Sequence, residues 1–117
     1  NKFNNKVLTI KCDLSKENSY KKIISIIKSK KLKIQFFIQS AGMGYYGKFV
    51  KSELSKNLKI IEINIKSIVS LSYFLTKHMM SHGDKSYIVN IGSLSSFCPS
   101  PEMTIYSCSK NFIEKFL

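Results

Sequence analysis

The chain has 117 residues, 44% of them hydrophobic, which fits one globular domain and excludes collagen-like, low-complexity and disordered classes. Its formal net charge is +12, but all 19 basic residues are lysines. Arginine makes the bidentate contacts that read guanine and clamp phosphate, so a solvated lysine surface is favoured over a nucleic-acid interface. The apolar runs are too short or too interrupted to span a bilayer. We therefore expect neither nucleic acid nor membrane as a partner.

The first predicted elements lie before residue 39. Residues 6–12 (KVLTIKC) predict a strand that ends at Asp13, and Asp13 or Ser15 is expected to cap the helix that follows. That helix has one apolar face at i, i+3, i+4 and i+7 spacing, formed by Tyr20, Ile23, Ile24 and Ile27. The near-continuous apolar run 33–38 (KIQFFI) is typical of a strand buried on both faces of a parallel sheet.

The second half continues the alternation of strands and helices. After a glycine-rich turn, a long helix is predicted from about Ser55 to about Met80, with Gly83 as its stop. Residues 86–91 (SYIVNI) predict a third strand, and a last helix follows a serine-rich loop from about Thr104. The order β-α-β-α-β-α predicts an α/β domain with a parallel sheet.

Two sequence features suggest sites that their context does not support. The segment Gly42–Gly47 (GMGYYG) matches Gly-x-Gly-x-x-Gly, but the helical pattern starts well after the third glycine. We therefore interpret it as a flexible turn at a strand end. His78 and His82 are one helical turn apart but lack the glutamate of a His-Glu-x-x-His zinc motif, so they are read as helix-end residues and no metal site is predicted.

The cysteines and the chain ends bear on the compartment and on completeness. Cys12, Cys98 and Cys108 lack Cys-x-x-Cys spacing, which favours reduced thiols in a cytoplasmic protein. The chain begins without a methionine and ends inside a helical pattern. We therefore expect it to be part of a longer protein.

One constellation near the carboxyl end suggests chemistry. A phenol is protonated at neutral pH, and a neighbouring ammonium favours the phenolate. Lys110 lies four residues after Tyr106 and so shares a helix face with it. A serine at a strand end, here Ser93, can orient the same substrate oxygen. A Tyr-x-x-x-Lys pair alone is weak evidence in a lysine-rich chain.

Five motifs in chain order give this pair a context. They are CDLS at 12–15, QSAG at 39–42, INIKS at 63–67, IVNIGS at 88–93 and YSCSK at 106–110. In this order and at these intervals the chain resembles the short-chain dehydrogenase/reductase family over almost its whole length. The resemblance implies a Rossmann-like, doubly wound parallel sheet, present here in part as three β-α units. Residues 1–117 would form the central part of a single NAD(P)-binding domain.

The resemblance also implies an activity and site residues. The family transfers a hydride between NAD(P)(H) and a carbonyl or secondary alcohol, and NADP is favoured here. Tyr106 would be the acid/base, Lys110 would favour its phenolate and bind the nicotinamide ribose, and Ser93 would orient the substrate oxygen. The catalytic asparagine would be Asn64, holding a water that links Lys110 to solvent. Cofactor-binding positions would be Asp13, Ser40, Ala41, Gly42, Tyr106 and Lys110.

The resemblance and the residues leave alternatives open. A nucleotide-sugar epimerase or dehydratase uses the same Tyr/Lys pair, and a regulatory protein could bind NAD(P) without turnover. Asn64 could bond only to neighbouring backbone, Ser93 could be a plain turn serine, and Asp13 could be only a helix cap. The family also suggests a homodimer or homotetramer built on the helices at 55–80 and 104–117.

Departures from the family pattern qualify this expectation. Gln39 and Ser40 stand where the family has two asparagines, so the side-chain bonds that brace the sheet are expected to differ. No Thr-Gly-x-x-x-Gly-x-Gly phosphate loop occurs in these residues. The predicted strands would be numbers 3, 4 and 5 of the order 3-2-1-4-5-6, in which 3 and 4 are not neighbours. We therefore expect a gap in the sheet and an incomplete, inactive fragment.

Overall fold

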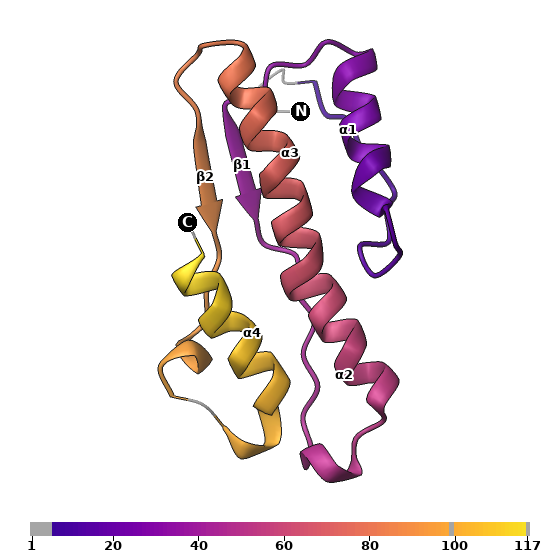
Figure 1. Cartoon of the computed structure of the whole chain (residues 1–117), viewed down its shortest axis with the longest axis vertical. Helices are drawn as coiled ribbons and strands as arrows, with labels where there is room; N and C mark the ends of the chain where they lie inside the picture. Colours follow the sequence, from indigo (N-terminus) through magenta and orange to yellow (C-terminus); the bar gives the residue numbers. More distant parts are fainter. Residues whose placement is uncertain (1–5, 99, 117) are drawn as a thin grey trace.

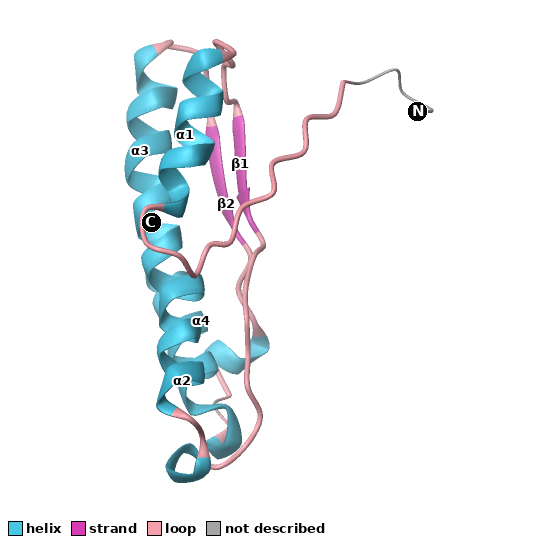
Figure 2. Ribbon diagram, turned by 90° about the vertical axis from the view of Figure 1, so that its right-hand side faces the viewer, coloured by secondary structure: helices cyan, strands magenta, loops and turns pink. Residues whose placement is uncertain are grey.

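The computed structural model describes residues 6–98 and 100–116 and forms an α/β arrangement of about 47 × 32 × 26 Å. Two parallel strands, β1 (Phe36–Gln39) and β2 (Tyr87–Asn90), pair in register from Phe36 opposite Tyr87 to Gln39 opposite Asn90 (Figure 1). The long helices are α1 (Ser19–Ser29), α2 (Leu54–Ile61), α3 (Ser67–Ser81) and α4 (Thr104–Lys115). In Figure 2 these helices lie on one side of the two strands. The predicted α/β class with a parallel sheet is confirmed.

The apolar face predicted for the first helix packs on the third. Ile27 of α1 is buried with Leu71 and Leu75 of α3, and Phe37 of β1 packs against this cluster. Tyr20 and Phe74 stack at a ring-centroid distance of 5.1 Å beside it. The i, i+3, i+4, i+7 pattern therefore predicted the buried face correctly.

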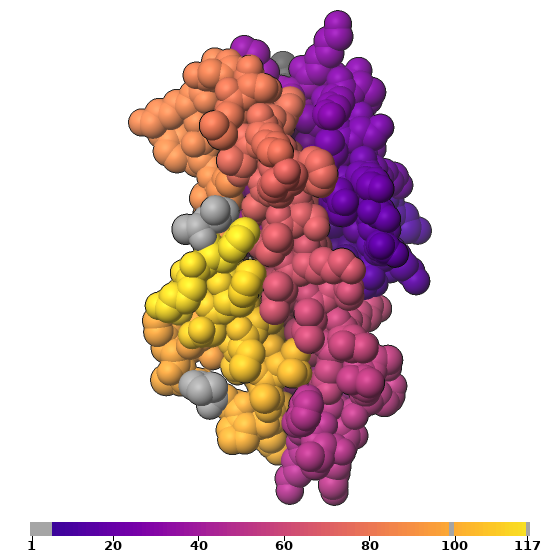
Figure 3. Space-filling model, in the orientation of Figure 1, coloured from indigo at the N-terminus to yellow at the C-terminus, as the bar shows by residue number. Residues whose placement is uncertain are grey.

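The predicted long helix contains a break in its α-helical geometry that the sequence did not predict. Between α2 and α3 the chain forms a π-helical turn, η2 (Glu62–Lys66). Such a turn inserts one extra residue into the helix and is often found at functional sites. The elements α2, η2 and α3 form one continuous helical rod, the α2–α3 rod, which ends at Ser81. Gly83 adopts a left-handed φ of +71°, as a helix stop requires. The surfaces of α2, α3 and α4 adjoin in the space-filling view (Figure 3).

The amino-terminal strand prediction is wrong for this structure. Residues 6–12 run as extended chain without strand pairing, to one side of the sheet in Figure 2. A strand needs a neighbour for its backbone groups, and β1 pairs here with β2. The cap prediction also fails, because α1 begins only at Ser19 and its N-cap is Asn18, without a side-chain cap bond.

Burial of β1 on both faces is likewise not observed. Phe36 is 62% exposed and Ile38 is 59% exposed, because the helices of the described chain cover the opposite face. Phe36 stacks on Tyr87 across the strands at 5.0 Å. The apolar run therefore correctly indicated a strand with two apolar faces, of which only one is covered here.

No helix within residues 6–98 and 100–116 is both long and apolar enough to cross a membrane.

Candidate active site

A cavity of about 480 Å³ lies beyond the carboxyl end of β1, beside the first turns of α4. Four of the predicted site residues line it, namely Ser40, Gly42, Tyr106 and Lys110. The carboxyl ends of parallel strands are the usual ligand-binding edge of an open α/β sheet. The fold therefore brings residues more than sixty positions apart to one hollow.

Lys110 is held in this hollow by the strand edge. Its side chain is buried, with 5% of the residue exposed, and its Nζ donates to the Ile91 carbonyl at 2.9 Å. Burying an ammonium is costly unless hydrogen bonds replace its water. The same Nζ lies 5.9 Å from the ring centroid of Tyr106, so α4 presents a fixed cation beside the phenol.

Asn64 sits in the π-helical turn and is fully buried. Its Oδ1 accepts from the Met43 N–H at 2.8 Å, and its Nδ2 donates to the Met43 carbonyl at 2.9 Å. This is the backbone bonding that the alternative interpretation described. An ideal Cβ on Gly42 would lie 3.6 Å from both Asn64 Oδ1 and Lys110 Nζ, so Asn64 also faces the site.

Ser109 is a positioning residue that the sequence interpretation missed. It is fully buried, and its Oγ donates to the Tyr106 carbonyl at 2.7 Å and accepts from Asn64 Nδ2 at 2.9 Å. It thus joins α4 to the π-helical turn. The signal available in the sequence was a small polar residue, Ser109, between Tyr106 and Lys110 on the buried face of α4.

The ring of Tyr106 packs on the backbone of the glycine-rich loop. A Cβ on Gly44 would lie 3.2 Å from Tyr106 Cδ2, which is closer than nearly all real contacts of this kind. Gly44 therefore allows the loop to approach the phenol ring. The loop is irregular, and α2 begins only at Leu54, seven residues after Gly47, so no α-helix starts at the third glycine as a dinucleotide phosphate loop requires.

The hydrogen bond of the Ser93 side chain stays within its own turn, unlike those of Asn64 and Lys110. It caps the short helix η3 (Leu94–Ser96), and its Oγ accepts from the Ser95 N–H at 3.2 Å. It is not among the described residues that line the 480 Å³ cavity. This bonding is that of a turn serine, and it leaves the hydroxyl proton available to another acceptor.

A second, smaller cavity adjoins the first through Ser40. It measures about 150 Å³, and Leu14, Ser40 and Ala41 are among its lining residues. Asp13 precedes Leu14, and its Oδ1 accepts from the backbone N–H of Ser15 at 3.0 Å and from the Ser15 hydroxyl at 2.7 Å. These bonds lower the pKa of Asp13, because they stabilise its carboxylate.

Gln39 braces the sheet in place of the family asparagine. Its Nε2 donates to Ser72 Oγ on α3 at 2.9 Å and to Asn90 Oδ1 on β2 at 2.7 Å. Asn90 in turn donates to the Phe116 carbonyl at 3.0 Å. The departure at this position therefore keeps a side-chain brace between strand and helix, as an altered set of bonds.

The two histidines contact backbone oxygens. His78 Nε2 lies 2.8 Å from the Leu32 carbonyl oxygen and His82 Nε2 lies 3.2 Å from that of Ile34. These contacts tie the end of α3 to the segment that enters β1. Among the described residues, no group of three His, Cys, Asp or Glu side chains could hold a metal ion.

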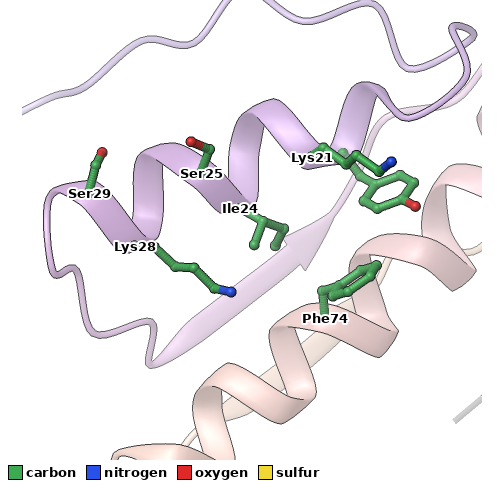
Figure 4. A pocket seen from close by; sticks show the side chains of 7 residues that line it. Lys21, Ile24, Ser25, Lys28, Ser29 and Phe74 are labelled. Atoms are coloured by element: carbon green, nitrogen blue, oxygen red, sulfur yellow. The ribbon is translucent and has the colours of Figure 1, made fainter.

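A larger cavity is remote from these residues. It measures about 640 Å³ and lies between α1 and α3, where Ile24, Lys28 and Phe74 point toward one another (Figure 4). Its remaining lining residues are Tyr20, Lys21, Ser25 and Ser29. Size alone therefore does not identify the site, and the clustering of titratable groups at the smaller hollow is the better guide.

Comparison with known proteins follows the same residues. The family described as short chain dehydrogenase matches residues 1–117. Very-long-chain 3-oxoacyl-CoA reductase of Mus musculus is 32% identical over 119 residues, covering 98% of this chain and 37% of that protein. The chain thus spans well under half of the length of this relative.

Solved structures agree on the fold. A 4-hydroxyisoleucine dehydrogenase complexed with NADH matches with a TM-score of 0.83 and 25% identity, over 89% of this chain and 46% of that one. A short-chain dehydrogenase from Sphingobium yanoikuyae in complex with NADPH matches with a TM-score of 0.74 and 27% identity, over 87% of this chain and 39% of that one. The two-stranded sheet is thus part of a Rossmann-type domain.

Proposed function

The chain belongs to the short-chain dehydrogenase/reductase family, and on that premise we propose that its protein is an NAD(P)(H)-dependent oxidoreductase acting on a carbonyl or secondary alcohol. The family membership supports an oxidoreductase. The residues that carry the reaction, the cofactor and the substrate class are the proposal.

The observation that carries the proposal is the setting of Tyr106 and Lys110. Both line one cavity at the strand edge, and the Lys110 ammonium is fixed there by the Ile91 carbonyl. A fixed cation at this place can stabilise the negative charge that develops on the phenol oxygen when a proton is transferred to a substrate. A protein that only bound a ligand would have no need of this pair.

In the reductive direction we assign the roles that the family resemblance implies. The Tyr106 hydroxyl donates its proton to the substrate oxygen while the carbonyl carbon accepts a hydride, and Lys110 stabilises the phenolate that remains. Ser93 orients the substrate oxygen with its free hydroxyl proton. Asn64 fixes the loop at Met43, and its Oδ1 retains a lone pair for a water that connects Lys110 to solvent.

The cofactor-binding residues fit a dinucleotide. Ser40 is shared by the two neighbouring cavities, with Gly42 and Lys110 in the larger and Ala41 in the smaller. Gly42 leaves open the space near Lys110 Nζ that a side chain would occupy. A bound NAD(P)H supplies the hydride. NADP is our prediction over NAD, and the ratio of kcat/KM values for NADPH and NADH tests it.

The test of the proposed function uses the protein at the full length that its gene encodes. Oxidation of NADPH and NADH is followed with a panel of ketones and aldehydes. In Tyr106→Phe we expect kcat/KM to fall about 10²- to 10⁴-fold, the usual contribution of general acid–base catalysis. Tyr73→Phe, at an exposed position on α3, is the matched control. Equal turnover in Tyr106→Phe and wild type would refute the proposal.

We also propose a homodimer or homotetramer built on the α2–α3 rod and α4. A cytoplasmic location is a further part of the proposal. Exposed apolar side chains along the rod support the assembly, for example Leu54, Leu58 and Met80. A mass measurement by light scattering tests the oligomer, and Leu58→Lys should shift it toward monomer. Cell fractionation tests the location.

A further inference from the structure

Part of the cavity wall beside Tyr106 is formed by aromatic and thioether side chains and comes from two separate loops. Met43, Tyr45 and Tyr46 follow β1, while Met103 belongs to the short helix η4 (Pro101–Met103) before α4. All four line the 480 Å³ cavity with Tyr106. Aromatic and thioether side chains bind flat or irregular apolar groups well, so this wall has the character of a recognition surface.

A backbone hydrogen bond connects the two loops. The Gly47 N–H donates to the Glu102 carbonyl at 2.8 Å. The Glu102 carboxylate lies beside the Tyr46 hydroxyl and raises the pKa of Tyr46 through a hydrogen bond and its charge. Gly47 has a φ of +149°, and a Cβ there would lie 3.0 Å from the Tyr45 hydroxyl oxygen, so glycine is required at this turn.

The wall itself carries no charge. Its four residues have neutral side chains, and Lys110 is the one charged side chain among the described residues that line the 480 Å³ cavity. The Glu102 carboxylate lines a neighbouring cavity of about 10 Å³ instead. A charged group placed against the wall would lose its hydration without gaining a partner there, so the wall favours a neutral apolar group.

Resting on the function proposed above, we propose that Met43, Tyr45, Tyr46 and Met103 form the substrate end of the cavity. This wall selects a ketone or secondary alcohol with an aromatic or other bulky apolar group beside the reacting carbon.

Two matched ketones test the selection at the protein's full length. Acetone lacks the phenyl group of phenylacetone. We expect kcat/KM for phenylacetone to exceed that for acetone by at least about tenfold, because an apolar pocket discriminates on this scale.

Variants of the wall assign the selection to named residues. Tyr46→Ala should lower the phenylacetone to acetone ratio about tenfold, whereas Tyr46→Phe keeps the ring and should keep the ratio. Met103→Ala is a second wall variant with the same expected direction.

The outcomes separate this inference from the proposed function. Active enzyme whose phenylacetone to acetone ratio is near one, or is unchanged in both Tyr46→Ala and Met103→Ala, overturns the wall while the oxidoreductase stands. Absence of cofactor oxidation with every carbonyl overturns both proposals.

Discussion

The two ends of the chain hold their predicted site residues in different ways. Around α4 the bonds are long-range: Asn64 reaches Met43 and Ser109, and Lys110 reaches Ile91. At the amino-terminal end, Asp13 bonds to Ser15, two residues along the chain. A motif comparison gives both regions equal weight. Long-range bonds join several elements, so we expect their loss to lower activity or stability more than the loss of a local bond.

Lys110→Met should give the largest effect. It removes the buried cation beside Tyr106 and leaves the Ile91 carbonyl without its donor, so we expect kcat/KM to fall about 10²- to 10⁴-fold. The matched control is Lys115→Met, at an exposed position on the same helix. Equal losses in the two variants would contradict a special role for Lys110.

Asn64→Leu tests the long-range bonds through stability. The change leaves both backbone groups of Met43, which are partly buried, without their side-chain partner, and an unsatisfied buried group costs up to about 1–3 kcal/mol. The free energy of unfolding, from urea titration at full length, should fall accordingly. Asn111→Leu, at an exposed position with one bond to the Ser96 carbonyl, should cost much less. A similar loss in both would show that the network adds little.

Gly44→Ala tests the close approach of the loop to Tyr106. The new Cβ, 3.2 Å from the ring, would shift the phenol by a few tenths of an ångström. We expect kcat/KM to fall roughly tenfold, since small misplacements of reacting groups are costly, with little change in stability. Gly92→Ala has no atom within 4 Å of its Cβ and serves as control. An unchanged rate in Gly44→Ala would mean that the ring has room to move.

Ser15→Ala tests the local contact and should have the smallest effect. It removes the hydroxyl that donates to Asp13, so the pKa of Asp13 should rise toward its ordinary value, as measured by NMR titration of the carboxyl carbon. A lowered folded-state pKa contributes stability above the unfolded-state pKa, and this is lost as the pH falls through the folded-state value. The acid limb of unfolding should therefore flatten slightly. An unshifted carboxyl would show that the turn does not matter to Asp13.

Several elements could be predicted because their signals are local. The apolar face of α1, the start of α4 near Thr104 and the stop at Gly83 all follow from residues within a turn or two of each other. The π-helical turn at 62–66 could not, because Asn64 in this turn bonds to Met43 and Ser109, which lie far from it in the sequence, and no local pattern encodes such bonds. The extended run at 6–12 failed for a similar reason, since a strand depends on a partner elsewhere.

The sequence by itself determined the family, the α/β order and the candidates Asp13, Asn64, Ser93, Tyr106 and Lys110, because ordered motifs and short-range periodicity survive in one dimension. Only the tertiary structure decided how these candidates meet. It buried Lys110 against the Ile91 carbonyl, made Ser109 a bridge and left Ser93 bonded within its own turn. The reason is physical: hydrogen bonds and burial depend on distances between residues far apart in the chain, and folding alone fixes those distances.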